Sequence, residues 1–375
     1  MKKITIMALH LGYGGIEKAI SDLANNLVAD FNVEIVSTYK LYEDSINKLD
    51  DNVKVKYLMN DRKPNRNEFF SYLKKLRFIQ VFKEGIKGLK TLYYKKKLMV
   101  NYLKNCESDI IISTRTFHNT LLSKYGSKNS VRIAWEHNYH NNNQKYINKL
   151  INSVKELDYF VVVSNTLYND YSKLLTNTNC KCVYIPNMVN IINSKLSKVN
   201  NHNLITVSRL SKEKGLFDLV DVVELVKNEI KDIKLNLIGD GDLFDSLLAY
   251  VKDKNLKDNV SFLGYMKSND VYKEYLKSSL YVMTSFTESF GIVLLESFTF
   301  GVPAIAFDSA NGACEIINSN NGILIANRDK KLMADTIINY LNDDNLRDKL
   351  SKGTQKDLQK YAPECIIVAW KKLFR

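Results

Sequence analysis

Short apolar runs alternate with amphipathic or polar stretches along the whole chain. The apolar runs have the length of strands and lie at residues 2–9, 31–38, 53–58, 108–114, 130–137 and 158–164, and again at 204–210, 233–241, 259–265, 279–285, 302–308 and 322–327. Parallel strands need crossover connections, which are usually helices. The alternation therefore predicts an α/β protein with doubly wound parallel sheets.

A polar stretch divides the pattern into two series. Residues 188–203 are rich in Asn, Ser and Lys and are the best candidate for a linker. We expect a Rossmann-like domain over 1–188, a second over 203–355, and a C-terminal helix over 356–375 that packs back toward the first domain. Ligands of open α/β sheets bind outside the carboxyl ends of the strands, so two such domains are expected to face each other across a cleft.

Length and composition indicate two globular domains, and the cysteine usage indicates a reducing compartment. The 375 residues are too many for one ordinary core, and 45% of them are hydrophobic and 25% charged. The N-terminal residues form a strand pattern and not a secretion signal, and no apolar run approaches the length of a membrane span. The five cysteines are scattered without a CxxC array, which argues against a metal site or a disulfide framework.

The positive charge is concentrated in one segment. Residues 62–104 contain thirteen Lys or Arg and two Glu, a net +11 in a chain of net +13. Phe, Leu, Ile and Tyr alternate with these cations at mostly helical spacing, which is typical of a basic amphipathic helix on an anionic membrane surface. The alternative is a helix whose apolar face packs on the sheet, and we expect partial packing with the basic face free. No motif for nucleic acid accompanies the charge.

The segment Thr287 to Glu296 carries the clearest chemistry. A strand ends in a short loop, and a helix is predicted to begin near Gly291. The amides after Phe290, those of Gly291, Ile292 and Val293, then form a phosphate-binding helix N-terminus. Glu288 precedes this helix and Glu296 lies more than one turn into it, so the two carboxylates are expected to have separate roles.

Two cations follow the first strand of the second series. Arg209 and Lys214 leave a strand end where a helix begins, and two fixed positive charges there neutralise a diphosphate without a metal. The alternative interpretation is a charged turn on the protein surface, which is where isolated basic residues more commonly lie.

The first series offers a glycine turn and a histidine. Gly14 and Gly15 follow the first strand and permit a tight turn and close approach to a ligand. The pattern GxGGxE is not the dinucleotide fingerprint GxGxxG, so it is a weak signal alone. His137 follows directly on a strand and is expected to face the cleft, and His118 is a weaker rival for the same role.

Together these segments resemble glycosyltransferase family 4, a family of retaining enzymes with the two-domain GT-B fold. The resemblance is carried by ESFGIVLLE (288–296) with SFTFGVPAIAFD (297–308), by SRLSKEKG (208–215), and by IGDGDL, FLGYM, ANGACEII and NNGILI. It is close over residues 200–345 and extends to the first domain through GYGGIEKAISDLA, EHN and VSN. The family's frequent HG or HD is EHN here, and residues 60–105 are not covered.

The resemblance implies a role for each motif. Arg209 and Lys214 would hold the diphosphate of a nucleotide-sugar together with the amides after Phe290. Glu296 would bind the ribose hydroxyls, and Glu288 would contact the donor sugar. His137 would lie near the anomeric carbon, while Gly14 and Gly15, counted among the donor-binding residues, would let the first domain close on phosphate and acceptor. The implied reaction is front-face displacement with retention and needs neither metal nor other cofactor.

The function expected on these grounds is a retaining transferase. It would move a hexose or N-acetylhexosamine from a nucleotide-sugar, taken as UDP-linked, to a membrane- or lipid-linked glycan acceptor of the cell surface. The basic segment would place it in the cytoplasm, peripheral to the inner face of the membrane. Two alternatives remain open, a nucleotide-sugar epimerase of the same fold and a non-catalytic nucleotide-sugar binder. A dehydrogenase is disfavoured by the form of the glycine motif.

Overall fold

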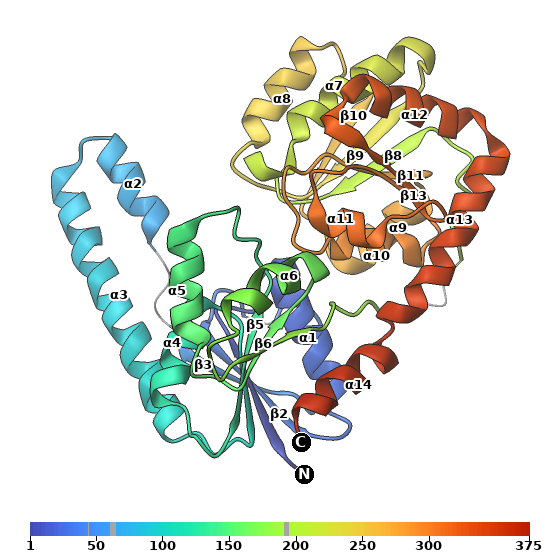
Figure 1. Cartoon of the computed structure of the whole chain (residues 1–375). Helices are drawn as coiled ribbons and strands as arrows, with labels where there is room; N and C mark the ends of the chain where they lie inside the picture. Colours follow the sequence, from blue (N-terminus) through green and yellow to red (C-terminus); the bar gives the residue numbers. More distant parts are fainter. Residues whose placement is uncertain (44, 61–64, 191–194) are drawn as a thin grey trace. The chain divides into compact units, whose positions relative to one another are not determined.

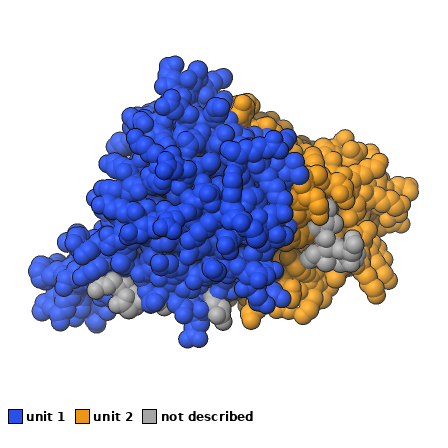
Figure 2. Space-filling model, turned by 90° about the horizontal axis from the view of Figure 1, so that it is seen from below, with its two compact units in different colours: residues 1–162, 170–184, 367–375 blue, residues 163–169, 185–366 orange. Residues whose placement is uncertain are grey.

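The computed structural model describes residues 1–43, 45–60, 65–190 and 195–375, with the side chains of residues 66 and 67 also left out. The described chain forms two compact units, coloured separately in Figure 2. Unit 1 comprises Met1–Val162, Asp170–Tyr184 and Ile367–Arg375, and unit 2 comprises Val163–Asn169 and Ile185–Ile366. Each unit contains one parallel sheet, so the predicted class of two Rossmann-like parallel-sheet domains is confirmed.

The sheet of unit 1 has the strand order β3-β2-β1-β4-β5-β6-β7, with all neighbouring strands parallel. The strands are β1 Lys3–Ala8, β2 Asn32–Tyr39, β3 Lys54–Met59, β4 Ile110–Ser113, β5 Val131–Glu136, β6 Tyr159–Val162 and β7 Lys181–Tyr184. The helices wholly in unit 1 are α1 Gly15–Leu27, α2 Arg66–Lys74, α3 Phe78–Lys104, α4 Thr116–Tyr125 and α5 Gln144–Val154. Two helices, α6 Asn165–Leu174 and α14 Pro363–Leu373, begin in unit 2 and end in unit 1. The strand order reverses between β1 and β4.

The sheet of unit 2 has the order β10-β9-β8-β11-β12-β13 and is also parallel. Its strands are β8 Asn203–Val207, β9 Lys234–Ile238, β10 Val260–Gly264, β11 Leu280–Met283, β12 Ala304–Phe307 and β13 Gly322–Ile325. Its helices are α7 Leu216–Glu229, α8 Phe244–Asp253, α9 Ser268–Leu276, α10 Ile292–Thr299, α11 Asn311–Ile316, α12 Lys330–Asn342 and α13 Asp344–Leu358, with 3-10 turns η1 Lys212–Lys214, η2 Ala326–Arg328 and η3 Gln359–Tyr361. The order reverses between β8 and β11.

The core of unit 2 explains why these segments fold as they do. Apolar residues three or four apart on α7, such as Leu219, Val223 and Val226, are fully buried beneath the strands that carry Leu235 and Val282. The strands of a parallel sheet covered on both faces are apolar on both sides, which matches their continuous hydrophobic sequence. The sheet is thus a rigid platform whose polar residues gather at the strand ends.

The last helix packs on the first unit. Trp370 is fully buried in unit 1, and its ring packs edge-on against Trp135 with centroids 5.0 Å apart. Phe374 packs on Phe31, and Lys371 pairs with Asp30 at 2.5 Å. The C-terminal part of α14 therefore belongs to the core of unit 1.

The basic segment forms a helical hairpin, α2 and α3, that projects from the sheet of unit 1 (Figure 1). In α3 the buried residues are Thr91, Met99 and Leu103, so the helix packs chiefly through its C-terminal part. The apolar residues before them remain exposed, 68% for Phe78 and 70% for Phe82. Arg62 and Lys63 of the predicted basic segment lie outside the described residues. No helix in the described part of the chain is both long and apolar enough to cross a membrane.

Candidate functional site

The loop after β11 depends on two glycines for its path. Gly291 caps α10 with φ at +90°, a left-handed conformation that a residue with a side chain rarely adopts. Gly312 lies against the backbone of Phe290, where a Cβ would come within 2.5 Å, and its N–H donates to the carbonyl of Glu288 at 2.8 Å. These contacts hold Glu288 at the start of α10, whose first N–H groups have no partners within the helix.

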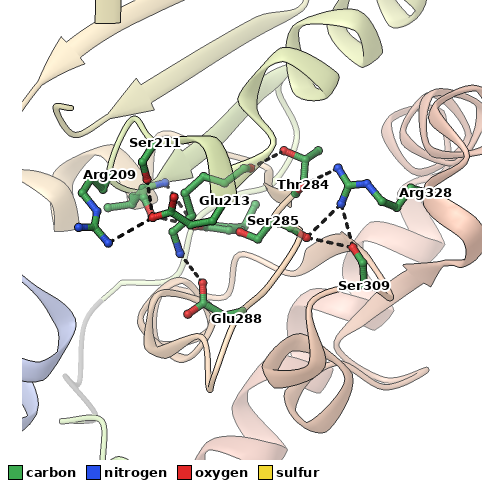
Figure 3. Close-up of polar contacts among 11 residues, drawn as sticks. Arg209, Ser211, Glu213, Thr284, Ser285, Glu288, Ser309 and Arg328 are labelled. Atoms are coloured by element: carbon green, nitrogen blue, oxygen red, sulfur yellow. Dashed lines mark hydrogen bonds and ion pairs between the residues drawn. The ribbon is translucent and has the colours of Figure 1, made fainter. Parts of the chain in front are cut away.

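The loop after β8 meets this loop through one ion pair. Lys214 lies in η1, and its Nζ donates to Glu288 Oε2 at 2.5 Å (Figure 3). The side chains are 18% and 19% exposed, so the pair is largely withdrawn from water. Gly215 follows with φ at +61°, and a Cβ there would lie 2.1 Å from the carbonyl oxygen of Thr284. The structure thus brings the predicted diphosphate cation and the predicted sugar-contacting carboxylate into direct contact.

A pocket opens where these two loops meet, at the point where the strand order reverses. Its lining comes from β8, β11, the loops that follow them and the first turn of α10: Thr206, Val207, Ser208, Lys214, Tyr281, Met283, Thr284, Ser285, Glu288 and Val293. The Ser208 hydroxyl is buried and has no hydrogen-bond partner among the described residues. Open α/β sheets bind ligands at such switch points, and this pocket contains an unsatisfied polar group.

Arg209 lies farther out than expected from its motif. Its side chain is 72% exposed, and its Nη2 bonds to Glu213 Oε1 at 3.2 Å. Partial burial acts to raise the pKa of Glu213, but a hydrogen bond from Ser211 and the nearby charges of Arg209 and Lys214 outweigh it, so the net shift is downward. Lys214 is therefore the cation of the pocket, and Arg209 is at its exposed rim.

Glu296 lies on α10, whereas Phe290 lies in the loop before this helix. The charge of Glu296 and that of Glu288 both contribute to raising the pKa of Tyr281, after its burial, which places both carboxylates near this pocket-lining phenol. The Phe290 side chain is 3% exposed and packs against Tyr361. Phe290 thus contributes its backbone to the site, while its ring anchors the loop to the core.

Arg328 organises the site, although no motif pointed to it. Its guanidinium donates to the carbonyls of Thr284 and Ser285, to the Ser309 hydroxyl and to Asp218 (Figure 3). The same group lies 3.7 Å from the ring centroid of Phe286 and 4.5 Å from that of Phe307. One side chain therefore fixes the start of the Glu288 loop to α7 and β12.

Unit 1 has its own polar cluster at the carboxyl ends of β1 and β4. Gly14 caps α1, and a Cβ there would lie 2.2 Å from Glu17 Oε2. Glu17 is 4% exposed and accepts a hydrogen bond from Arg115 Nη2 at 2.7 Å. Gly14 and Gly15 are exposed at the first turn of α1. Arg115 was not predicted, because a single arginine after a strand carries no recognisable pattern.

His137 and His118 are both buried and neutral near pH 7. Burial, and next the charge of Arg115, lower the pKa of His137 to about 3, and its Nε2 has no partner among the described residues. Burial, then the charges of Lys95 and Arg115, likewise lower the pKa of His118 to about 3. His118 Nε2 lies 2.9 Å from the Thr38 hydroxyl, which ties His118 to the core. Its Nδ1, like Nε2 of His137, is buried without a hydrogen-bond partner among the described residues.

Among the described residues there is no group of three or more His, Cys, Asp or Glu side chains that could hold a metal ion. The five cysteines are all unpaired.

The fold and the pocket define the class, which is the GT-B arrangement of two parallel α/β domains with a ligand pocket at the switch point of the second sheet. Residues 189–357 match the family model described as glycosyl transferases group 1. Over this segment the chain is similar to that family.

Similar proteins agree with this assignment. A poly(ribitol-phosphate) alpha-N-acetylglucosaminyltransferase of Staphylococcus aureus is 28% identical over 300 residues, 76% of this chain and 58% of that protein. The chain thus spans less than two thirds of that relative. A Campylobacter jejuni alpha-1,4-N-acetyl-D-galactosaminyltransferase, named for a diphospho-undecaprenol-linked substrate, is 27% identical over 382 residues, 100% of this chain and 98% of that protein.

A solved structure shows the same fold over the whole chain. The structure of a mutant of the S. aureus protein TarM, described as a complex with fondaparinux, alpha-GlcNAc-glycerol and UDP, has a TM-score of 0.81. It is 19% identical and covers 100% of both chains. At this identity the similarity establishes the fold alone.

Replacing Arg328 by Ala should lower the free energy of unfolding by about 2 kcal/mol, because two carbonyls and Asp218 lose their donor. Chemical denaturation followed by circular dichroism measures the change. Arg347→Ala is the control, since Arg347 bonds to Asp344 and to carbonyls of α12, away from the pocket.

The two variants are then compared for nucleotide binding, which only Arg328→Ala should weaken. Equal nucleotide affinity in both would contradict a role for Arg328 in holding the loop.

Stability should fall as the pH drops from about 6.5 toward 3, because His118 and His137 accept protons in the unfolded chain before they do in the folded one. The unfolded state binds more protons throughout that window, so the sign is a loss of stability on acidification. His118→Gln removes one of these groups and should flatten the slope of unfolding free energy against pH. A slope identical to that of the wild type would show that the buried histidine does not titrate in this way.

Proposed function

We propose that this chain is a retaining glycosyltransferase that uses a nucleotide-sugar, UDP-linked, to extend a glycan of the cell surface. One observation carries the proposal. At the switch point of the second sheet, Lys214 and Glu288 face each other beside the N-terminus of α10, in a pocket with a buried unpaired hydroxyl. Such a site suits an anion next to a polar, uncharged group, which is the chemistry of a diphosphate joined to a sugar.

Donor binding is proposed to exchange the partner of Lys214. A diphosphate at the start of α10 carries more negative charge than Glu288 and also accepts hydrogen bonds from the helix amides. Lys214 Nζ would turn from Glu288 to the diphosphate, with Arg209 approaching from the rim. Glu288 would then be free to accept hydrogen bonds from the sugar hydroxyls, and Glu296 from the ribose.

The proposed reaction needs no protein nucleophile. The bond between the anomeric carbon and the diphosphate oxygen breaks while the acceptor oxygen attacks from the same face, and the departing diphosphate takes the acceptor proton. Stabilisation of the developing negative charge is then the main demand on the protein. Lys214, Arg209 and the amides of Gly291, Ile292 and Val293 supply it, so we propose that the reaction is independent of metal.

The acceptor side is proposed to be unit 1. His137 retains an available ring nitrogen, and Gly14 and Gly15 leave the first turn of α1 open. The relative in S. aureus is named for poly(ribitol-phosphate), and the relative in C. jejuni is named for a diphospho-undecaprenol-linked glycan. These names support a lipid-linked or polymeric glycan of the cell envelope as the acceptor, with a hexose or N-acetylhexosamine as the group transferred.

The α2–α3 hairpin is proposed to rest on the anionic inner face of the cell membrane. Its exposed apolar residues repeat at helical spacing, at Phe78, Phe82, Ile86 and Leu89, with exposures from 40% to 70%. Basic side chains flank this stripe along the same helix, namely Lys83, Lys87, Lys90, Lys96 and Lys97. Apolar insertion combined with attraction to anionic lipid is the mode of binding of such helices.

Removing either member of the pocket pair should abolish most turnover. Lys214→Ala and Glu288→Ala should each reduce the rate of donor hydrolysis by about a hundredfold, because each removes a charge that acts on the departing group or the sugar. A panel of UDP- and GDP-sugars identifies the donor, and hydrolysis is measured with and without EDTA. Lys212→Ala, at an exposed lysine of the same turn, is the control. Undiminished turnover in both pocket variants would refute the site, and sensitivity to EDTA would refute metal independence.

Replacing apolar residues of the hairpin should weaken membrane binding while the fold is retained. Phe82→Ser with Leu89→Ser should reduce co-sedimentation with vesicles containing phosphatidylglycerol by about tenfold, because two exposed apolar side chains are lost. Leu248→Ser, at an exposed leucine of α8 in unit 2, is the matched control. If the double variant and the control sediment equally, the hairpin is not the membrane contact.

A further inference from the structure

Lys95 is a half-buried lysine without a carboxylate. It lies on α3, and its Nζ stands 4.0 Å from the ring centroid of Phe117 and 5.8 Å from that of Tyr39. Among the described residues, no carboxylate lies within ion-pair distance of this Nζ. Burial lowers the pKa of Lys95, and the nearby charge of Arg115 lowers it further. Phe117 lies two residues after Arg115, the N-cap of α4, so the Lys95 ammonium stands beside the start of this helix.

Arg115 is only partly neutralised. Its Nη2 bonds to Glu17 Oε1 at 2.7 Å, but its Nε is buried and has no acceptor among the described residues. Glu17 is also 3.8 Å from His10, whose pKa is lowered chiefly by burial. Glu17 thus has two basic neighbours, Arg115 and His10, and of these only Arg115 carries a permanent charge. A buried donor without an acceptor is costly, and so is a desolvated ammonium without an anion.

The surrounding groups favour an anion over a neutral ligand. Arg115 precedes the ten-residue helix α4, whose first amides, beginning with that of Thr116, are directed toward the same end of the sheet. His118 is neutral and fully buried, so it adds no positive charge of its own. The Lys95 ammonium lies over Phe117 in the first turn of α4, and Arg115 is the residue that caps this helix. An ammonium, a guanidinium and helix amides are the groups that bind the oxygens of a phosphate.

We infer that Lys95 and Arg115 form an anion-binding subsite in unit 1 that holds a phosphate group of the acceptor. The inference rests on the proposed function and deepens it, since it names a phosphate ester or diphosphate as part of the acceptor. The residues of the subsite belong to unit 1, and those of the donor pocket belong to unit 2. Lys95 also continues the helix whose exposed apolar residues precede it, so a phosphate near a lipid surface is within the reach of the same element.

The test measures phosphate binding with the donor pocket filled. The full chain is saturated with UDP and titrated by calorimetry with sn-glycerol 3-phosphate or with farnesyl diphosphate, and glycerol serves as the uncharged analogue. Lys95→Met keeps an apolar stem over Phe117 and should weaken the binding of either phosphate by about tenfold, since a charge-assisted contact is lost. Arg115→Lys, which keeps the charge but loses the fork, should weaken it as well.

Lys104→Ala removes an exposed charge from the same helix and should leave the affinity within about twofold of the wild type. Tighter binding of farnesyl diphosphate than of glycerol phosphate supports a lipid-linked source, and the reverse order supports a polymer phosphate. Equal affinities for wild type, Lys95→Met and Arg115→Lys, all with unchanged circular dichroism, would overturn the subsite. Binding of glycerol as tight as that of its phosphate would overturn it too.

The outcome is separable from that of the proposed function. If the wild type neither binds UDP nor hydrolyses any nucleotide-sugar, the transferase proposal fails, whatever the phosphate titration shows. If the wild type hydrolyses a donor but its phosphate affinity does not depend on Lys95 or Arg115, only the subsite fails.

Discussion

The contact between Lys214 and Glu288 joins the two loops that form the candidate site. It links the end of β8 to the end of β11 across the switch point of the sheet, and both side chains are about four-fifths buried. An ion pair that has lost most of its water stays stable only while each charge keeps a partner. A ligand that replaces one partner must therefore bring charge of the same sign, and this constraint selects an anion for Lys214.

The rest of unit 2 acts to keep these loops in place. Gly215 lets the backbone pass within contact of Thr284, and Gly312 lets α11 close against Phe290. Arg328 then ties the carbonyls of Thr284 and Ser285 to α7. Such a preorganised arrangement reduces the reorganisation needed when charge develops on a leaving group.

The sequence predicted the strands and the glycine turn at Gly291 well, because parallel strands are apolar on both faces and a helix start needs a recognisable cap. It predicted Lys214 and Glu288 as site residues through their motifs. It did not predict Arg328, whose partner Asp218 is 110 residues away, nor the exposure of Arg209. Contacts of this kind arise from packing between distant segments and leave no local pattern.

The same limit applies to unit 1. The basic segment predicted a charged amphipathic helix, but the amount of apolar surface that stays exposed on α3 depends on where the sheet ends, which periodicity does not reveal. Arg115 and Lys95 lie on different elements and come near each other only after α3 packs on β3 and α4. The sequence alone therefore does not show that these two positive charges act on each other.

A crystal structure with UDP tests the exchange of partners at Lys214 most directly. We expect the diphosphate at the first turn of α10, with Lys214 Nζ moved from Glu288 to a phosphate oxygen and the ribose beside Glu296. A UDP bound elsewhere, or a diphosphate at α10 with the pair between Lys214 and Glu288 intact, would contradict this exchange.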